Sequence, residues 1–93
     1  MHILLIEDEP KTAATVRSFL EEHHMTVDCA YDGHTGSQLA TQNQYVVIVS
    51  DVILPHANGL DLCRELRNRG VATPILLLSA HSQTEDKITG LNA

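Results

Sequence analysis

Residues 45–55 read YVVIVSDVILP, an apolar run that carries one carboxylate, Asp51, in its middle. An ionised group left unpaired in apolar surroundings is costly, so such a group needs a compensating partner. The residues before it, VVIVS at 46–50, have the length and β-branched composition of a buried strand. The sequence therefore predicts a strand that ends at Asp51, and a partner for its charge outside this strand.

On both sides of this run, strand patterns alternate with helix patterns. Pro10 suits the first turn of a helix, Asn58 is expected to cap another, and Gly70 to stop it. Alternation of this kind predicts an α/β fold, a parallel sheet with right-handed crossovers and helices on both faces. The predicted strands are residues 2–6, 25–31, 46–50 and 73–79, and the predicted helices are 10–24, 35–44, 60–70 and a last one that opens at the capping-box pattern of Ser82 and Glu85 and carries Ile88 and Leu91.

Composition limits the possible functions. The chain has 93 residues, of which 43% are hydrophobic, which suits one compact domain with a small core. Its net charge of -6 disfavours binding to a nucleic-acid backbone and favours a cation or a basic partner. No apolar run approaches the roughly 20 residues that span a bilayer, and the early acidic residues argue against a signal peptide, so we expect a cytoplasmic protein. Cys29 and Cys63 are expected to be buried free thiols.

Polar residues end three of the predicted strands. In a parallel α/β sheet the ligand crevice lies beyond the carboxyl ends of the strands, which meet at one edge. Glu7 and Asp8 follow the first strand, Asp51 the third, and Ser79 ends the fourth. Two carboxylates roughly 4 Å apart at an effective dielectric near 20 repel by about 4 kcal/mol. A divalent cation relieves this repulsion, and hard oxygen ligands favour Mg²⁺ over zinc.

These residues also resemble a known family. EDE after the first strand, DVILP after the third and SA after the fourth are similar to the receiver domain of bacterial two-component response regulators. The resemblance covers residues 1–93, and it also includes YDG, LPHANGLDLCRELR and EDKITGLNA. It implies one receiver domain, incomplete at its carboxyl end, with a flavodoxin-like sheet of strand order 2-1-3-4 from which the fifth strand and helix are absent.

The resemblance implies a role for each site residue. Asp51 is the phosphoacceptor, Asp8 binds Mg²⁺ directly, Glu7 binds it directly or through water, the backbone carbonyl of Ile53 is a further metal ligand, and Ser79 hydrogen-bonds the phosphoryl group. The family's lysine lies at the end of a fifth strand, beyond this sequence. Lys87 is not expected to replace it, because it falls within the last predicted helix.

The function implied is that of a phosphoacceptor switch rather than an enzyme. A sensor histidine kinase would donate the phosphoryl group to Asp51 with Mg²⁺ present, and the receiver would assist its own phosphorylation and slow dephosphorylation. The signal would pass to an output domain for transcription, so nucleic acid would be contacted only through that domain. An alternative is a truncated, non-switching receiver that acts as a dimerisation or phosphate-sink module.

Two other function classes use this architecture. A flavodoxin-like electron carrier needs a hydroxyl- and glycine-rich phosphate loop after the first strand, where this chain has EDEP. A phosphohydrolase with an aspartyl-phosphate intermediate usually has a second Asp two residues after the nucleophile, where this chain has Ile53. Both classes are therefore disfavoured.

One expectation concerns the carboxyl end. With no fifth strand, residues 73–79 would form a long, apolar and exposed sheet edge, and an uncovered face would lie beside the first helix. Exposed edges and apolar patches favour association. We therefore expect homodimerisation or wider self-association through this strand.

Overall fold

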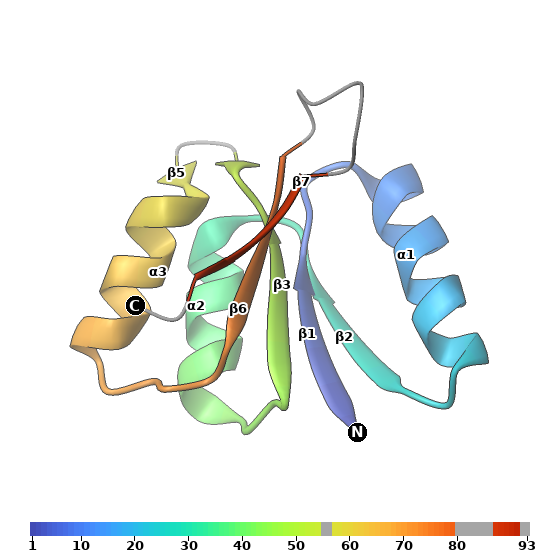
Figure 1. Cartoon of the computed structure of the whole chain (residues 1–93), viewed down its shortest axis with the longest axis horizontal. Helices are drawn as coiled ribbons and strands as arrows, with labels where there is room; N and C mark the ends of the chain where they lie inside the picture. The colour runs from blue at the N-terminus through green and yellow to red at the C-terminus, as the bar shows by residue number, and fades with distance from the viewer. Residues whose placement is uncertain (55–56, 80–86, 92–93) are drawn as a thin grey trace.

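The computed structural model of the chain describes residues 1–54, 57–79 and 87–91. A five-stranded sheet of order β2-β1-β3-β6-β7 forms its centre (Figure 1). The four parallel strands have the predicted order 2-1-3-4, which is confirmed. The strands are β1 (His2–Ile6), β2 (Thr26–Ala30), β3 (Val47–Asp51), β6 (Ile75–Ser79) and the antiparallel β7 (Lys87–Leu91).

In the described residues, three helices cover the sheet, and they lie on both of its faces as predicted. They are α1 (Pro10–Glu22), α2 (Gly33–Gln42) and α3 (Gly59–Asn68). Helix α1 packs on one face, and α2 and α3 lie side by side on the other (Figure 1). No helix in the described ranges is long and apolar enough to cross a membrane.

Local capping explains where the helices begin. Pro10 opens α1, where its missing N–H costs no hydrogen bond. The Asp32 carboxylate accepts the Thr35 N–H at 2.7 Å, so α2 begins at Gly33, two residues before the predicted start. Asn58 caps α3 as predicted, because its side-chain oxygen accepts the Leu60 N–H at 2.6 Å.

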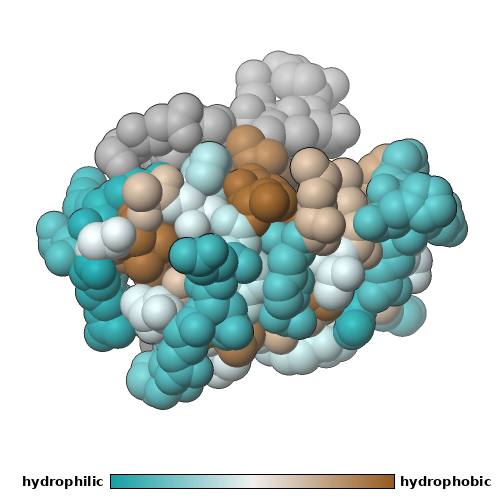
Figure 2. Space-filling view, turned by 90° about the horizontal axis from the view of Figure 1, so that it is seen from below, coloured by the Kyte–Doolittle hydropathy of each residue, from teal (hydrophilic) through white to brown (hydrophobic). Residues whose placement is uncertain are grey.

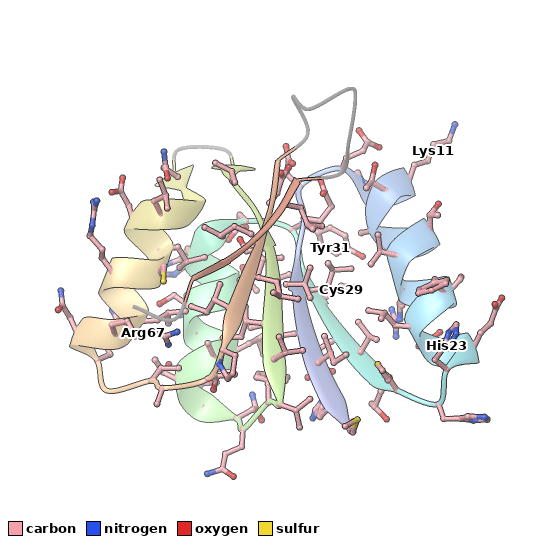
Figure 3. The ribbon with its side chains drawn as sticks, in the orientation of Figure 1. Lys11, His23, Cys29, Tyr31 and Arg67 are labelled. Carbon is pink, nitrogen blue, oxygen red and sulfur yellow. The ribbon has the colours of Figure 1, made fainter. Side chains whose placement is uncertain are left out.

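Alternation along the strands divides the core into two layers. Residues on one face of the sheet pack under α2 and α3, and residues on the other pack under α1, so side chains fill the space on both sides (Figure 3). The first layer includes Leu4, Ile6, Ile48, Leu66 and Leu77, and the second includes Ile3, Leu5, Ala13 and Val27. Cys63 is buried and Cys29 half-buried, and both are free thiols.

Strand β7 corrects the prediction for the end of the chain. Residues 80–86, with Ser82 and Glu85, lie outside the described residues, but 87–91 pair antiparallel with β6, from Ser79 opposite Lys87 to Ile75 opposite Leu91. The predicted helix is therefore wrong over 87–91. The segment KITGL combines two β-branched residues with a glycine, which are weak helix formers, and pairing satisfies the backbone groups of β6.

The same strand removes the premise of the predicted self-association. Because β7 pairs along β6, residues 75–79 form an interior strand. The expectation that this strand is an exposed edge is therefore wrong. The two outer strands of the sheet are β2 and β7.

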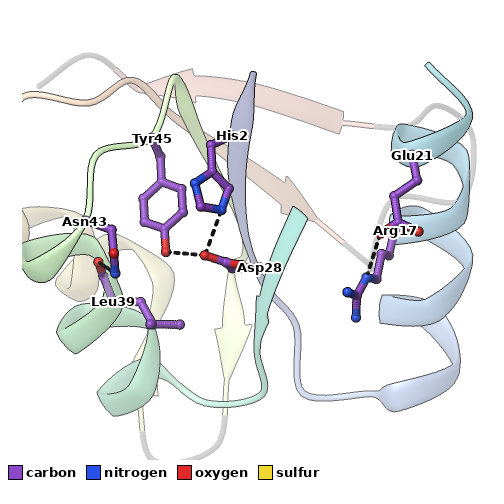
Figure 4. A network of polar contacts seen from close by, with 7 residues as sticks. All are labelled: His2, Arg17, Glu21, Asp28, Leu39, Asn43 and Tyr45. Atoms are coloured by element: carbon purple, nitrogen blue, oxygen red, sulfur yellow. Dashed lines mark hydrogen bonds and ion pairs between the residues drawn. The ribbon is translucent and has the colours of Figure 1, made fainter. Parts of the chain in front are cut away.

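A polar network joins three segments at the amino-terminal edge of the sheet (Figure 4). The Tyr45 hydroxyl donates to an Asp28 carboxylate oxygen at 2.8 Å, and Nε2 of His2 lies 2.8 Å from the same oxygen. The rings of His2 and Tyr45 meet edge to face, with centroids 4.8 Å apart. One carboxylate thus connects the first residue of β1, the middle of β2 and the residue that precedes β3 by two positions.

These contacts determine the ionisation of the network. Burial raises the pKa of Asp28, but hydrogen bonds from Tyr45 and His2 and the charge of His2 outweigh it, so the pKa lies below its ordinary value. Burial, followed by the Asp28 hydrogen bond and charge, raises the pKa of Tyr45 far above its ordinary value. Asp28 is therefore held as a carboxylate. Figure 2 shows this lower side of the molecule, where hydrophilic residues surround limited apolar patches.

Candidate metal and phosphoryl site

Three carboxylates lie together at the carboxyl ends of the parallel strands. Each of Glu7, Asp8 and Asp51 offers an oxygen, and these oxygens all lie within 4.8 Å of one another. The sheet register explains the meeting, because β1 and β3 are neighbours and Ile6 pairs with Ser50. The residues that follow Ile6 and Ser50 therefore lie side by side at the carboxyl ends of β1 and β3.

The site is partly withdrawn from water. Glu7 is 7% exposed and Asp51 9% exposed, whereas Asp8 is exposed. Burial raises the pKa of Glu7, and the charges of Asp51 and Asp8 raise it further, although a hydrogen bond from the Glu9 N–H at 3.0 Å opposes them. For Glu7, the effects that raise the pKa outweigh this hydrogen bond.

The backbone around Asp51 is fixed from both sides. The next residue, Val52, donates its N–H to the carbonyl of Leu78 at 3.0 Å, which ties the end of β3 to β6. The Ser50 hydroxyl donates to the Asp51 carbonyl at 3.0 Å. Asp51 therefore sits at the last position of a strand whose neighbours hold it in place.

Gly59 is a further residue of the site that our sequence reasoning missed. It opens α3 directly against β3, and its N–H donates to the Val52 carbonyl at 2.6 Å. A Cβ at this position would lie 2.6 Å from the Asp51 carbonyl oxygen and 3.1 Å from the Val52 Cα. The Asn-Gly pair of residues 58–59 was the available signal, since glycine often marks a close backbone approach.

The structure places the backbones of the remaining predicted residues at or after the same edge. Leu78 pairs with Asp51, so Ser79, the last residue of β6, stands at the carboxyl edge beside it. Ile53 follows Asp51 by two residues and opens β4 (Ile53–Leu54), which pairs with β5 (Ala57–Asn58). The phosphoryl hydrogen bond of Ser79 and the carbonyl ligand of Ile53 remain predictions.

The donor set suits a hard divalent cation. All three side chains offer carboxylate oxygen, and in the described part of the chain no histidine or cysteine belongs to the group. Mg²⁺ prefers a few carboxylates and keeps part of its water shell, for which the exposed Asp8 side leaves room. The residues present therefore fit Mg²⁺ better than zinc.

Comparison with known proteins identifies the family. The model of the response regulator receiver domain family matches residues 3–93. The chain belongs to this family. Similar curated proteins include response regulator ArlR of Staphylococcus saprophyticus, 41% identical over 97% of this chain, and transcriptional regulatory protein DltR of Streptococcus agalactiae, 36% identical over 99%. The chain covers only 40% and 41% of these two relatives.

Solved receiver structures share the fold. The receiver domain of the Francisella response regulator 1452 has a TM-score of 0.82 at 32% identity, over 89% of this chain and 69% of that one. Response regulator TrrA of Thermotoga maritima, in complex with Mg²⁺ and BeF, has a TM-score of 0.81 at 27% identity, over 87% of this chain and 70% of that one. The predicted flavodoxin-like receiver fold is confirmed.

Proposed function

We propose that residues 1–93 act as one receiver domain in which Asp51 accepts a phosphoryl group from a sensor histidine kinase or a small acyl phosphate. The observation that carries the proposal is the convergence of Glu7, Asp8 and Asp51, with oxygens within 4.8 Å, at the strand ends of a receiver fold. Among these carboxylates, Asp51 is the one that ends the central strand β3.

The transfer is a displacement at phosphorus. A carboxylate oxygen of Asp51 uses an electron pair to form the new P–O bond. The bond from phosphorus to the donor breaks, and its electron pair leaves with the imidazole of a phosphohistidine, which takes up a proton, or with acetate. Positioning and charge stabilisation carry most of the catalysis in such transfers, which suits a nucleophile on a fixed strand end.

The acidic residues would hold a Mg²⁺ ion. Asp8 and Asp51 would bind it directly, Glu7 directly or through water, and the Ile53 carbonyl would be a further ligand. When bound, the ion offsets the carboxylate charges and stabilises charge on the transferring phosphoryl group. The raised pKa of Glu7 supports this role, because it arises first from burial and then from the charges of Asp51 and Asp8, and a bound cation would offset both effects.

The phosphoryl group would then act as the signal. It brings strong acceptor oxygens and added negative charge to the edge of the sheet. Ser79, the last residue of β6, would donate a hydrogen bond to it and bias the segment that follows. The similarity to DltR, a transcriptional regulatory protein, supports an output in transcription through a further domain.

Slow turnover of the phosphoryl group would distinguish this receiver from a phosphohydrolase. Ile53 stands two residues after Asp51 and has no side-chain acid or base to activate water or a leaving group. The acyl phosphate would therefore persist long enough to act as a signal.

Incubation with acetyl phosphate and Mg²⁺ tests the proposal. Intact-mass spectrometry should show one added phosphoryl group that hydroxylamine removes, and Asp51→Asn should abolish it. Asp28→Asn, at the opposite edge of the sheet, is the matched control and should still be labelled. A phosphorylated histidine, or labelling that survives Asp51→Asn, would refute the assignment.

A further inference from the structure

Ser50 places a hydroxyl in an apolar layer of the core. It is 0% exposed and precedes Asp51 in β3. Its partners in the sheet register are Ile6 on β1 and Leu77 on β6, and both are buried. Paired residues of a parallel sheet share a face, so Ser50 lies in the layer under α2 and α3 (Figure 1). A buried hydroxyl is costly unless it forms a hydrogen bond, so the fold must supply an acceptor for it.

Small size explains only part of the choice of serine. A Cβ on Gly36 of α2 would lie 2.5 Å from Ile6 Cδ1, and a Cβ on Gly59 of α3 would lie 3.1 Å from Leu77 Cδ2. Both helices thus closely approach the side chains that flank Ser50, and a large side chain between them would be overpacked. Alanine would meet this requirement and bury no polar group. The steric argument therefore accounts for a small residue but not for its hydroxyl.

The hydroxyl finds its acceptor at the proposed phosphoacceptor. It donates to the Asp51 carbonyl at 3.0 Å, and the N–H of the same peptide group, which belongs to Val52, donates to the Leu78 carbonyl at 3.0 Å. The Gly59 N–H donates to the next carbonyl, that of Val52, at 2.6 Å. The peptide group after Asp51 is therefore held at its oxygen and at its nitrogen, and the peptide group before it belongs to the paired strand β3. Together these bonds fix the direction in which the Asp51 side chain leaves the backbone.

We propose that Ser50 is a positioning residue for phosphoryl transfer, whose hydroxyl holds the peptide group after Asp51 and so fixes the direction of the Asp51 carboxylate. The inference rests on the proposed function for the transfer, and on the hydrogen bonds around Asp51 for the geometry. In-line displacement needs the attacking oxygen in a narrow range of positions, and a displacement of about 1 Å can slow a reaction roughly a hundredfold. Mg²⁺ keeps several waters and would also be held by Asp8 and Glu7, so its affinity depends less on the direction of one carboxylate. Loss of the hydroxyl should therefore slow transfer more than it weakens Mg²⁺ binding.

The hydrogen bond is tested first, on the unphosphorylated chain, by amide hydrogen exchange followed by NMR spectroscopy. The internal reference is the Ile48 N–H, which donates to the Pro74 carbonyl at 2.9 Å near the start of β3. In Ser50→Ala the exchange rate of the Val52 N–H should rise about tenfold relative to that of Ile48, the factor expected for one lost hydrogen bond. An unchanged ratio of the two rates would mean that the hydroxyl does not hold this peptide group, and would overturn the proposal.

The role is tested by the rate of phosphorylation with acetyl phosphate at saturating Mg²⁺. Ser50→Ala should react about tenfold more slowly, whereas its Mg²⁺ affinity should stay within about threefold of the wild type. Ser50→Cys, with a weak S–H donor, should react at an intermediate rate, and it carries the same tests if Ser50→Ala does not fold. Ser37→Ala is the matched control, because Ser37 is also buried and its hydroxyl donates to Glu65 Oε2 at 3.1 Å, in the contact between α2 and α3. Its rate should equal that of the wild type.

The outcomes separate this inference from the proposed function. If the wild type is phosphorylated on Asp51 and Ser50→Ala reacts at the same rate, the role of Ser50 is refuted and the proposed function stands. Equal losses of rate and of Mg²⁺ affinity would also refute it, because the effect would then lie in metal binding. A rate in Ser37→Ala as low as in Ser50→Ala would reduce the effect to a general loss of stability and refute it too. If the wild type is not phosphorylated, the proposed function fails, and the role of Ser50 with it.

Discussion

Carboxylates near the two ends of the parallel strands have opposite surroundings and opposite pKa shifts. At the amino-terminal edge, one carboxylate, Asp28, receives the Tyr45 hydroxyl and has His2 at 2.8 Å, and its pKa is lowered. At the carboxyl edge, three carboxylates face one another within 4.8 Å, and the pKa of Glu7 is raised, first by burial. The first end of the strands supplies hydrogen-bond donors to its carboxylate, whereas the second gathers three carboxylates.

This difference separates a structural group from a binding group. A carboxylate with internal donors stabilises the fold without a ligand, so its removal should weaken folding and leave metal binding intact. Crowded carboxylates cost stability until a cation arrives, so their removal should weaken binding and leave folding intact or improved. Variants at the two ends of the strands test this division.

Asp8→Asn should produce the largest change, in Mg²⁺ affinity. It removes a charged ligand from the cluster, and the loss should be about tenfold to a hundredfold on the scale of charged hydrogen bonds. Isothermal titration calorimetry measures it. Ser79→Ala is the control, because the hydroxyl is assigned to the phosphoryl group and not to the metal; an equal loss in both variants would refute the division of roles.

Gly59→Ala should destabilise the fold by about 1–3 kcal/mol, the usual range for overpacking. The new Cβ would lie 2.6 Å from the Asp51 carbonyl oxygen, so β3 and α3 must separate. The Mg²⁺ affinity should fall as well, because Asp51 moves with the backbone. Urea unfolding and metal titration together measure both effects.

Gly70→Ala is the matched control for this prediction. Gly70 has a φ of 86°, and nothing lies within 4 Å of a Cβ built there, so its substitution costs only the left-handed conformation, about 1–2 kcal/mol. It should leave the Mg²⁺ affinity unchanged. A loss of Mg²⁺ affinity in Gly70→Ala equal to that in Gly59→Ala would mean that the effect does not arise from contact with Asp51.

Tyr45→Phe should destabilise the fold by about 1 kcal/mol, because it leaves the Asp28 carboxylate short of one donor. The Mg²⁺ affinity should not change, since the network lies at the other edge of the sheet. Urea unfolding measures the loss. Tyr31→Phe, at a half-exposed tyrosine, should stay within about 0.5 kcal/mol of the wild type; an equal loss there would contradict the role given to the Asp28 bond.

The sequence predicted the carboxyl edge better than the amino-terminal edge. The end of a strand is marked in the sequence by a short apolar run that stops at a polar residue. Parallel pairing brings such ends together regardless of how the helices pack. Glu7, Asp8 and Asp51 could therefore be grouped from sequence. The contact of Asp28 with Tyr45 joins residues 17 positions apart through side-chain geometry, which no periodicity encodes.

The errors in prediction have physical causes of their own. The capping-box pattern of Ser82 and Glu85 predicted a helix, but pairing with β6 determines the structure of 87–91, and pairing energy is invisible to local propensity. Helix α2 begins two residues before the predicted start, because Asp32 caps it even though Gly33 is a poor helix former. Gly59 was missed because its importance lies in a contact across the fold.

The smallest expected effects are two pH dependences of opposite sign, measured by urea unfolding in metal-free buffer. The pKa of folded Asp28 is lowered from 3.8, so its contribution to stability is present above 3.8 and is lost as the pH falls through the folded pKa. Asp28→Asn should therefore be less stable than the wild type at neutral pH, and the difference should shrink in acid.

Glu7 should behave in the opposite way. Its folded pKa is raised from 4.5. Its contribution to the free energy of unfolding is therefore fully present below pH 4.5 and is lost as the pH rises through the folded pKa. Glu7→Gln should therefore be more stable than the wild type at neutral pH without metal, and this gain should vanish in acid. Saturating Mg²⁺ should reverse the order, because the ion stabilises the wild-type cluster more than the variant. If both Asp28→Asn and Glu7→Gln changed the free energy of unfolding at neutral pH in the same direction, the proposed difference between the two ends of the strands would be refuted.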